Sequence, residues 1–380
     1  MTRPVTAWAE LFGGAYDGRK VFVTGHTGFK GSWLVRWLLL LGAEVTGYAL
    51  DPPTDPSLFE DLGLARRMRH IVADVRDGGR LRAEMAAAAP DIVFHLAAQP
   101  LVRLSYDEPV ATYETNVLGT VNLLEAVRAT PSARAVVNVT SDKCYENRET
   151  GQAYREDDAM GGFDPYSSSK GCAELVTSAY RRSFFGEGSD VRLASVRAGN
   201  VVGGGDWAFD RIVPDCIRAL MAGEPIVVRN PDAVRPWQHV LEPLSGYLHL
   251  GSLMLAGGHE HDGAWNFGPE DAGTVRVRQV VDAVVDGWGS GSWVTPEGAP
   301  KQPHEATLLA LDITKAKEQL GWRPVYGVDA TLWATTAWYR VRHASADAAD
   351  ERTVADIEEY VSAALIAGAP WAGTPPEGND

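Results

Sequence analysis

The chain has 380 residues, of which 50 are Asp or Glu and 35 are Lys or Arg, so its formal net charge at pH 7 is −15. A diffuse negative charge of this size disfavours binding to nucleic acid and to anionic membranes. Apolar residues make up 45% of the chain, which is typical of a globular protein. The length suits one α/β unit with an added substrate-binding region.

The three cysteines, Cys144, Cys172 and Cys216, show neither a CxxC pair nor a metal-ligand spacing. We therefore expect neither a disulfide framework nor a metal site, and reduced thiols are typical of the cytoplasm. The N-terminal sequence has no long apolar core followed by a cleavage site, and the longest apolar runs are too short to span a bilayer. A cytoplasmic protein without a membrane partner is the expectation.

Residues 18–200 alternate between short apolar runs and helix-like segments. The predicted strands are 20–25, 44–50, 68–75, 91–98, 134–141 and 191–203, and the predicted helices are 31–43, 116–129 and 166–182. Continuous apolar strands separated by helices are typical of a parallel sheet that is covered on both faces. The sequence therefore predicts a doubly wound α/β domain of the Rossmann type.

After residue 200 the sequence no longer alternates regularly between predicted strands and helices. Residues 201–235 and 266–340 are rich in loops, which predicts a smaller, discontinuous substrate-binding domain, while 236–265 is expected to return to the first domain. Residues 345–380 read as a tail, and we expect its end to be mobile.

Three glycines, Gly25, Gly28 and Gly31, lie between the first predicted strand and the first helix. Glycine allows a tight turn and a close approach to a pyrophosphate, and a helix N-terminus favours negative charge. Ordinary turns also use glycine, but the strand–turn–helix setting favours a dinucleotide site. Asp51, after the second strand, is placed to bind ribose hydroxyls, which favours NAD over NADP; a plain loop aspartate is the alternative. Asp74, after the third strand, is expected near the adenine.

Tyr166 and Lys170 are four positions apart in a predicted helix, so both lie on one face. A nearby ammonium lowers the pKa of a phenol, and a phenolate can accept a proton from a sugar hydroxyl as hydride leaves the carbon. A second polar group, Ser141, Asp142 and Lys143, ends the strand predicted just before this helix. A strand-end ion pair is the ordinary explanation of an adjacent acid and amine, but the combination favours catalysis.

These motifs resemble the extended short-chain dehydrogenase/reductases, the group of nucleotide-sugar epimerases and dehydratases. The resemblance covers about residues 18–338 and is carried by "TGHTGFKGSWL", "HLAAQPLV", "TNVLGT", "TSDKCY", "YSSSK" and "RPWQHVLEP". Within this group the motifs are most similar to the CDP-glucose 4,6-dehydratase family, which implies NAD as cofactor and CDP-glucose as substrate. The implied reaction is a hydro-lyase reaction: C4 is oxidised, water is lost across C5 and C6, and hydride returns to C6.

The resemblance also implies roles for single residues. Tyr166 is the base for C4 oxidation, and Ser141 hydrogen-bonds the 4-oxygen. Asp142 is the acid for the C6 hydroxyl, and Lys143, which stands where relatives acting on dTDP-glucose or GDP-mannose have glutamate, is the base for the C5 proton. A lysine is a base only when neutral; desolvation and nearby cations favour the neutral amine, whereas Asp142 favours the ammonium.

Further residues are expected to complete the two binding sites. In the cofactor site these are Thr27, Phe29, Ala97, Tyr166 and Lys170. In the substrate site they are Gln99, Asn200, Arg211, Arg229 and Arg235. A guanidinium can form two parallel hydrogen bonds to the oxygens of a diphosphate. For each arginine taken singly, a surface ion pair is the ordinary alternative.

Two other functions remain open from the sequence. Another short-chain enzyme, either a dehydratase for a different nucleotide-hexose or a C4 epimerase, would need Tyr166 and Lys170; an epimerase or a reductase would not need the Asp142–Lys143 pair. A non-catalytic nucleotide-binding protein would be expected to have lost Tyr166 or Lys170. By analogy with the four-helix interface of the family, we expect a homodimer or a tetramer that uses helices at about 103–129 and 166–183.

Overall fold

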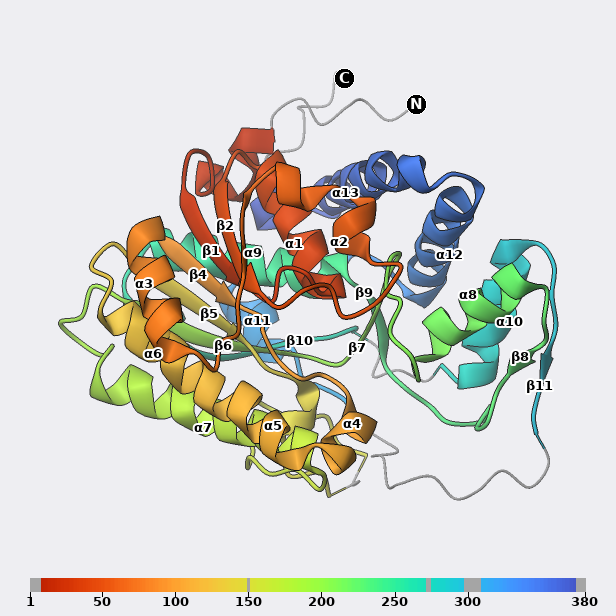
Figure 1. Cartoon of the computed structure of the whole chain (residues 1–380), viewed down its shortest axis with the longest axis horizontal. Coiled ribbons are helices and arrows are strands. Elements are labelled where there is room, and N and C mark those ends of the chain that lie inside the picture. Colours follow the sequence, from red (N-terminus) through yellow and green to blue (C-terminus); the bar gives the residue numbers. More distant parts are fainter. Residues whose placement is uncertain (1–7, 149–150, 271–274, 297–308, 374–380) are drawn as a thin grey trace.

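The computed structural model describes residues 8–148, 151–270, 275–296 and 309–373. At its centre is a seven-stranded sheet with the strand order β10-β6-β5-β4-β1-β2-β3 (Figure 1). All six pairings between neighbouring strands are parallel. The strands are β1 (Lys20–Thr24), β2 (Glu44–Ala49), β3 (Arg69–Val72), β4 (Ile92–His95), β5 (Ala135–Val139), β6 (Arg192–Ala198) and β10 (Gly263–Phe267). The doubly wound α/β fold predicted from the sequence is confirmed.

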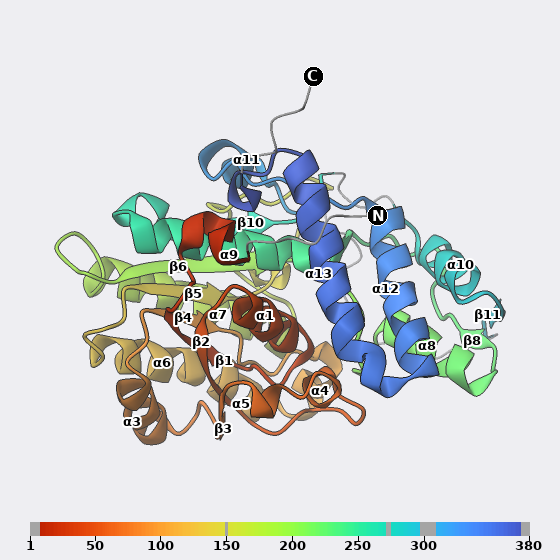
Figure 2. The ribbon, with the colours of Figure 1, turned by 90° about the horizontal axis from the view of Figure 1, so that it is seen from above.

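Helices cover both faces of this sheet (Figures 1 and 2). On one face lie α1 (Phe29–Leu40) and α9 (Leu241–Ala256); on the other lie α3 (Gly78–Ala88), α6 (Gly119–Arg128) and α7 (Pro165–Ser183). Side chains alternate between the faces along a strand. Val21 and Val23 of β1 therefore join one apolar core, and Phe22 joins the other.

The predicted strand 191–203 is two strands in the structure. After β6, residues Asn200–Val202 form β7, which leaves the main sheet and pairs in parallel with β9 (Trp237–His239). Beyond it, a group of smaller elements lies to one side of the sheet in Figure 1. This group contains α8 (Ile212–Ala222), β8 (Ile226–Val227), α10 (Val277–Trp288) and β11 (Trp293–Val294). The division into two domains stays a prediction.

The remaining elements connect or flank these layers. The short helices are α2 (Leu58–Asp61), α4 (Val102–Asp107), α5 (Pro109–Tyr113), α11 (Thr314–Gln319), the π-helical η3 (Glu114–Leu118), and the 3-10 helices η1 (Trp8–Gly14), η2 (Leu64–Arg66), η4 (Asp142–Cys144), η5 (His259–His261), η6 (Ala346–Ala348) and η7 (Pro370–Ala372). Two long helices, α12 (Val328–Ala344) and α13 (Ala349–Ile366), close the chain. Within the described ranges, no helix is both long and apolar enough to cross a membrane.

Much of the predicted tail is folded against the body of the protein. Helix α13 packs on α1, and the ring of Trp371 stacks on that of Phe12 with centroids 4.9 Å apart. Trp37 and Tyr360 complete this aromatic cluster, which joins the two ends of the described chain. The last residues, which we expect to be mobile, lie at 374–380, outside the described part of the chain.

Candidate active site

The loop between β1 and α1 comes very close to neighbouring backbone. Gly25 has φ +74°, and a Cβ atom there would lie 2.6 Å from the backbone nitrogen of Ala97. A Cβ atom at Gly31 would lie 2.2 Å from the carbonyl oxygen of Gly25, so both positions require glycine. Among the described residues no side chain caps α1 at Gly28, which leaves its N-terminal amides and dipole for an anion. This geometry fits the pyrophosphate of a dinucleotide, with Phe29 as the first residue of the helix.

The predicted adenosine side is built from the ends of β2 and β3. The hydroxyl of Thr27 donates to the carbonyl of Leu50 at 2.9 Å, which ties the glycine loop to the end of β2. Asp51, the next residue, is exposed. The carboxylate of Asp74 accepts hydrogen bonds from Nε and Nη2 of Arg76 at 2.8 and 2.6 Å. An adenine contact by Asp74 would therefore compete with Arg76.

Ser141, Asp142 and Lys143 follow the end of β5 in a tight turn. The hydroxyl of Ser141 accepts from the backbone nitrogen of Lys143 at 3.2 Å and donates to Oδ1 of Asp142 at 3.0 Å. Helix α7 begins close by, with Asp164 as its N-cap and Tyr166 as its second residue. The side chain of Ser141 is also hydrogen-bonded to the phenol of Tyr166. The structure thus brings together the four residues from two separate motifs.

The charges around Tyr166 act in opposite directions. Burial raises the pKa of the Tyr166 phenol, while the Ser141 hydrogen bond and the charges of Lys143 and Arg211 lower it without cancelling the rise. The phenol is therefore protonated at neutral pH in the protein alone. Burial also raises the pKa of Asp142, against the charge of Lys143 and the Ser141 hydrogen bond. A carboxyl group with a raised pKa is suited to carry a proton.

Lys170 lies one helical turn after Tyr166 and is almost completely buried. Its ammonium donates to the carbonyl of Val139, the last residue of β5, at 3.5 Å. Burial lowers the pKa of Lys170 to about 8, although Glu174 and Cys144 oppose this shift. Lys170 therefore lies beside the end of β5, and its lowered pKa is close to physiological pH.

Lys30, which we did not single out from the sequence, belongs to the same site. Burial lowers its pKa to about 8, with further lowering by the charges of Lys170 and Arg211, while Asp142 opposes the shift. Its ammonium lies 5.8 Å from the centre of the Tyr247 ring. The available signal was its position: a lysine in the first turn of α1 opposes the helix dipole.

Among the predicted substrate residues, Arg211 lies close enough to Tyr166 and Lys30 for its charge to act on both. Nη1 of Arg211 is held by Oδ2 of the buried Asp206 at 2.8 Å. Asn200 lies in β7, opposite Trp237 of β9.

The other three substrate candidates are engaged with nearby protein groups. The side-chain amide of Gln99 donates to the carbonyl of Leu101 and to Thr112, at 3.1 and 2.9 Å. Arg229 is half-exposed, 3.6 Å from Oδ1 of Asp210. Arg235 donates to the carbonyl of Val234 at 3.1 Å. Their substrate contacts stay predictions.

The parallel sheet, the glycine loop and the Tyr166–Lys170 helix beside a polar strand end define an extended short-chain dehydrogenase/reductase. The chain belongs to the GDP-mannose 4,6 dehydratase family, whose sequence model matches residues 22–335. The family predicted from the sequence is therefore confirmed.

Individual relatives narrow the comparison. A CDP-glucose 4,6-dehydratase of Salmonella typhimurium is 53% identical over 330 residues, which cover 86% of this chain and 91% of the relative. A dTDP-glucose 4,6-dehydratase of Streptomyces griseus is 30% identical over 84% of this chain and 93% of its own length.

Two solved structures have the same fold. A dTDP-glucose 4,6-dehydratase of Streptomyces venezuelae, with NAD bound, has a TM-score of 0.69 and 26% identity over 84% of this chain and 96% of its own. A UDP-glucose 4-epimerase of Thermus thermophilus, in complex with NAD, has a TM-score of 0.70 and 26% identity over 84% and 98%. Dehydratases and epimerases thus share this fold, so the fold alone does not distinguish the two activities. The residues of the active site have to provide that distinction.

Proposed function

We propose that the protein is an NAD-dependent CDP-glucose 4,6-dehydratase. It converts CDP-D-glucose to CDP-4-dehydro-6-deoxy-D-glucose and water. The observation that carries the proposal is an acid and an amine next to each other, the buried Asp142 and Lys143. Asp142 and Tyr166 are both hydrogen-bonded to the side chain of Ser141. A C4 epimerase or a reductase needs Tyr166 and Lys170 but has no step for an additional acid and base. The 53% identity to a CDP-glucose 4,6-dehydratase supports the choice of nucleotide.

The glycine loop, with Gly25, Gly28 and Gly31, and Lys170 would hold NAD. When bound, NAD supplies the acceptor for hydride from C4 and the donor of hydride to C6. Asp51 remains the proposed ligand of the adenosine ribose, and Asp74 of the adenine.

The side chains of the protein handle the protons. Tyr166 takes the proton of the C4 hydroxyl as its phenolate, a form that the Ser141 hydrogen bond and the charge of Arg211 favour, and Ser141 also hydrogen-bonds the 4-oxygen. Lys143, as the neutral amine, removes the C5 proton, which the neighbouring C4 ketone makes acidic, and returns this proton to C5 when hydride is added at C6. Asp142, with its raised pKa, donates a proton to the C6 hydroxyl, which leaves as water. The C4 alcohol ends as a ketone and C6 as a methyl group, so one water is the only by-product.

The substrate diphosphate is proposed to bind Arg211 and Asn200, with Arg235 and Arg229 as further candidates and Gln99 in the sugar pocket. Arg211 is the best supported of these, since Asp206 fixes its guanidinium next to the catalytic residues.

The protein is proposed to be a cytoplasmic homodimer. Helices α4, α5 and α7 lie side by side at one edge of the molecule (Figure 1). Their neighbourhood exposes large apolar side chains, among them Tyr106, Val110, Leu118, Phe163 and Leu175. Such a patch is typical of a subunit interface. The three cysteines are free thiols, which supports a reducing compartment. Light scattering at micromolar concentration tests the dimer, and a monomer contradicts it.

The activity is tested with a panel of nucleotide hexoses, by following the 4-keto product through its absorbance in base. CDP-glucose is expected to react and UDP-glucose, dTDP-glucose and GDP-mannose to react far more slowly. Tyr166→Phe should lower turnover by at least about 100-fold. Product from a different nucleotide hexose, with none from CDP-glucose, would favour the alternative dehydratase.

Lys143→Met separates dehydration from epimerisation. This change removes the amine but keeps an unbranched side chain, so C4 oxidation should continue while C5 deprotonation stops. NADH should then accumulate in a single turnover with CDP-glucose, and exchange of the C5 proton with deuterium should slow. Normal C5 exchange without NADH build-up would show that Lys143 is not the C5 base. A UDP- or CDP-galactose product from the wild type would identify an epimerase.

A further inference from the structure

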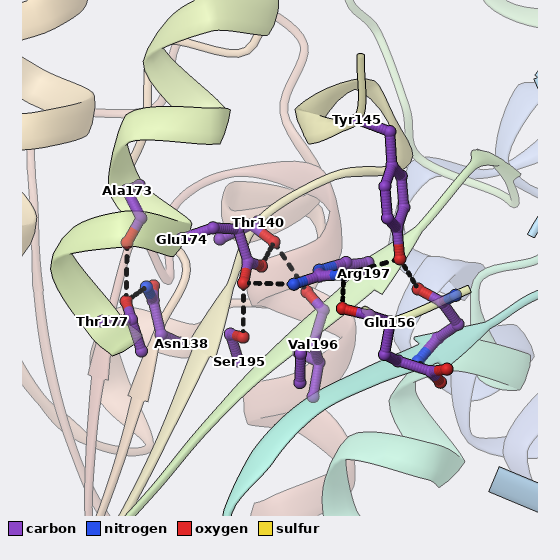
Figure 3. Close-up of polar contacts among 12 residues, drawn as sticks. Asn138, Thr140, Tyr145, Glu156, Ala173, Glu174, Thr177, Ser195, Val196 and Arg197 are labelled. Atoms are coloured by element: carbon purple, nitrogen blue, oxygen red, sulfur yellow. Dashed lines mark hydrogen bonds and ion pairs between the residues drawn. The ribbon is translucent and has the colours of Figure 1, made fainter. Parts of the chain in front are cut away.

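A buried polar network surrounds Thr140, the residue that follows β5 (Figure 3). At its centre is Glu174 of α7, one helical turn after Lys170 and two after Tyr166, so the three side chains share a face of the helix. The carboxylate of Glu174 is 4% exposed and pairs with Nη2 of Arg197 on β6 at 2.7 Å. The resemblance and the sequence motifs gave no role to this pair.

Glu174 is hydrogen-bonded to Thr140, the residue between β5 and the segment 141–143. Its Oε1 accepts a hydrogen bond from the hydroxyl of Thr140 at 2.5 Å, and its Oε2 accepts one from Ser195 at 2.7 Å. Thr140 immediately precedes Ser141 and Asp142, the residues that turn away from the strand end. A displacement of Thr140 would therefore move the acid and the serine with it.

Arg197 anchors the network on its other side. Its Nη1 donates to the hydroxyl of Tyr145 at 2.6 Å and to the carbonyl of Glu156 at 3.1 Å. Tyr145 follows the η4 turn that contains Asp142 and Lys143, and its hydroxyl donates to Asn266 at 2.8 Å. The network thus holds the catalytic turn at both ends, through Thr140 before it and Tyr145 after it.

We propose that Glu174 is a positioning residue of the active site, which fixes the catalytic turn through Thr140 and places a fixed negative charge one helical turn from Lys170. Glu174 does not touch the reacting atoms; it acts through these two residues. Arg197 keeps Glu174 ionised inside the protein, because a buried carboxylate needs a paired cation.

The charges that face Lys170 come from several elements. Glu174 on the same helix favours the ammonium, whereas burial raises the pKa of the Cys144 thiol, which therefore stays neutral at physiological pH. Lys30 on α1 is coupled to Lys170 by mutual repulsion, and protonation of His95 on β4 is opposed by Lys170. Burial is the largest influence on the pKa of Lys170 and lowers it, and Glu174 is the strongest opposing influence. Removal of this carboxylate should leave Lys170 neutral at physiological pH.

The test is the pKa of Lys170 in cofactor-free protein, measured by trace acetylation as a function of pH with mass-spectrometric readout, since only the neutral amine reacts. In Glu174→Gln the midpoint should fall by roughly one pH unit or more, the usual effect of one close charge. Glu174→Gln alone leaves the Arg197 guanidinium buried without its partner. The double variant Glu174→Gln/Arg197→Met removes both members of the pair, and the labelling midpoint of Lys170 should fall by the same amount. Ser195→Ala, which removes a hydrogen bond to the same carboxylate but no charge, should leave the midpoint in place.

Turnover provides a second readout, which rests on the proposed function. Loss of the Lys170 proton ends activity as pH rises, so the alkaline limb of turnover should move to lower pH in both neutral variants. If the neutral variants do not fold, Glu174→Asp takes their place. It keeps the charge and shortens the side chain by one methylene, so the labelling midpoint and the alkaline limb should both move to lower pH, but by less. An unmoved labelling midpoint in any folded Glu174 variant, or an equal shift in Ser195→Ala, would overturn the proposal. A wild type that turns over no nucleotide hexose would remove the proposed function and leave the labelling result intact.

Discussion

Asp142 and Glu174 are two carboxyl groups of nearly equal burial, 6% and 4% exposed, and both are hydrogen-bonded to residues at the end of β5. Their pKa values nevertheless move in opposite directions. Burial raises the pKa of Asp142, and neither Lys143 nor Ser141 reverses the shift. Burial also acts to raise the pKa of Glu174, but the charge and hydrogen bond of Arg197, with hydrogen bonds from Thr140 and Ser195, lower it overall.

The comparison shows that burial alone does not decide what a carboxyl group does. A carboxylate with a paired guanidinium and two hydroxyl donors is a fixed charge, which organises its surroundings. A buried carboxyl group with weaker compensation is able to hold a proton and release it. The end of β5 therefore lies beside two carboxyl groups with different behaviour, the proposed proton donor Asp142 and the fixed anion Glu174.

The largest expected effect is on stability, through the fixed anion. Glu174→Ala leaves Arg197 buried without its partner, and breaking a buried pair in this way should lower the free energy of unfolding by about 3–5 kcal/mol. Urea denaturation measures the loss. The matched control is Asp190→Ala, since Asp190 pairs with Arg134 where its own side chain is 81% exposed; its cost should be at most about 1 kcal/mol. Equal losses in the two variants would contradict the assigned difference.

The next largest effect is on catalysis, through the proton donor. Asp142→Asn keeps the shape of the side chain and removes the proton, so overall turnover should fall by at least about 100-fold, the usual effect of losing a positioned acid. C4 oxidation should persist, and NADH should accumulate in a single turnover with CDP-glucose. Asp190→Asn serves as the control and should retain normal turnover. A parallel loss of oxidation and dehydration in Asp142→Asn would point to a structural role for Asp142.

A smaller effect is expected from the Thr140 hydroxyl, which donates to Glu174 at 2.5 Å and has the carbonyl of Val196 as a longer second acceptor at 3.3 Å. Thr140→Val removes the donor to Glu174 but leaves Ser195 and Arg197, so the free energy of unfolding should fall by roughly 1.5 kcal/mol, the low end for a hydrogen bond to a charged group. Thr336→Val is the matched control, because the buried Thr336 hydroxyl has no hydrogen-bond partner among the described residues. That control should be neutral or slightly stabilising. A Thr140→Val variant as stable as the control would remove this contact from the network.

The sequence predicted the first half of the fold well, because its local signals agree with one another. The apolar runs at 20–25, 44–50 and 134–141 each contain a strand of the sheet, and the helix 166–182 matches α7 within a residue at each end. Asp164 caps that helix, with Pro165 as its first residue, so its start was set by local chemistry. Ser141, Asp142, Tyr166 and Lys170 lie on or next to these correctly predicted elements, so their closeness in the structure could be predicted as well.

The parts that sequence did not predict depend on contacts between distant segments. Nothing local indicated that β7 would pair with β9, or that α13 would pack on α1 and place Trp371 on Phe12. Glu174 follows a recognisable motif, yet its partner Arg197 lies on another strand. Lys30 was visible in the glycine loop, but its closeness to Asp142 and Lys170 depends on how α1 and α7 flank the sheet.

The smallest expected effect is a pH dependence of stability with opposite signs in two variants. Asp142 has a higher pKa in the folded protein than an ordinary Asp, about 3.9 in unfolded chains. The unfolded chain thus releases this proton first, and the wild type loses stability as pH rises from the unfolded pKa to the folded one. Asp142→Asn does not titrate there, so its Tm relative to the wild type should be higher at pH 7 than at pH 4.

Glu174 should behave in the opposite way. Its pKa is lowered in the folded protein, so the stability that it contributes is fully present above the unfolded pKa, about 4.3 for Glu, and is lost as pH falls through the folded pKa. Glu174→Gln should therefore show its largest Tm deficit at neutral pH, and the deficit should shrink on acidification. Thermal unfolding of cofactor-free protein between pH 3 and pH 8 measures both differences. If the two curves of Tm difference against pH slope the same way, then Asp142 and Glu174 do not hold their charges in the contrasting manner that assigns one to proton transfer and the other to positioning.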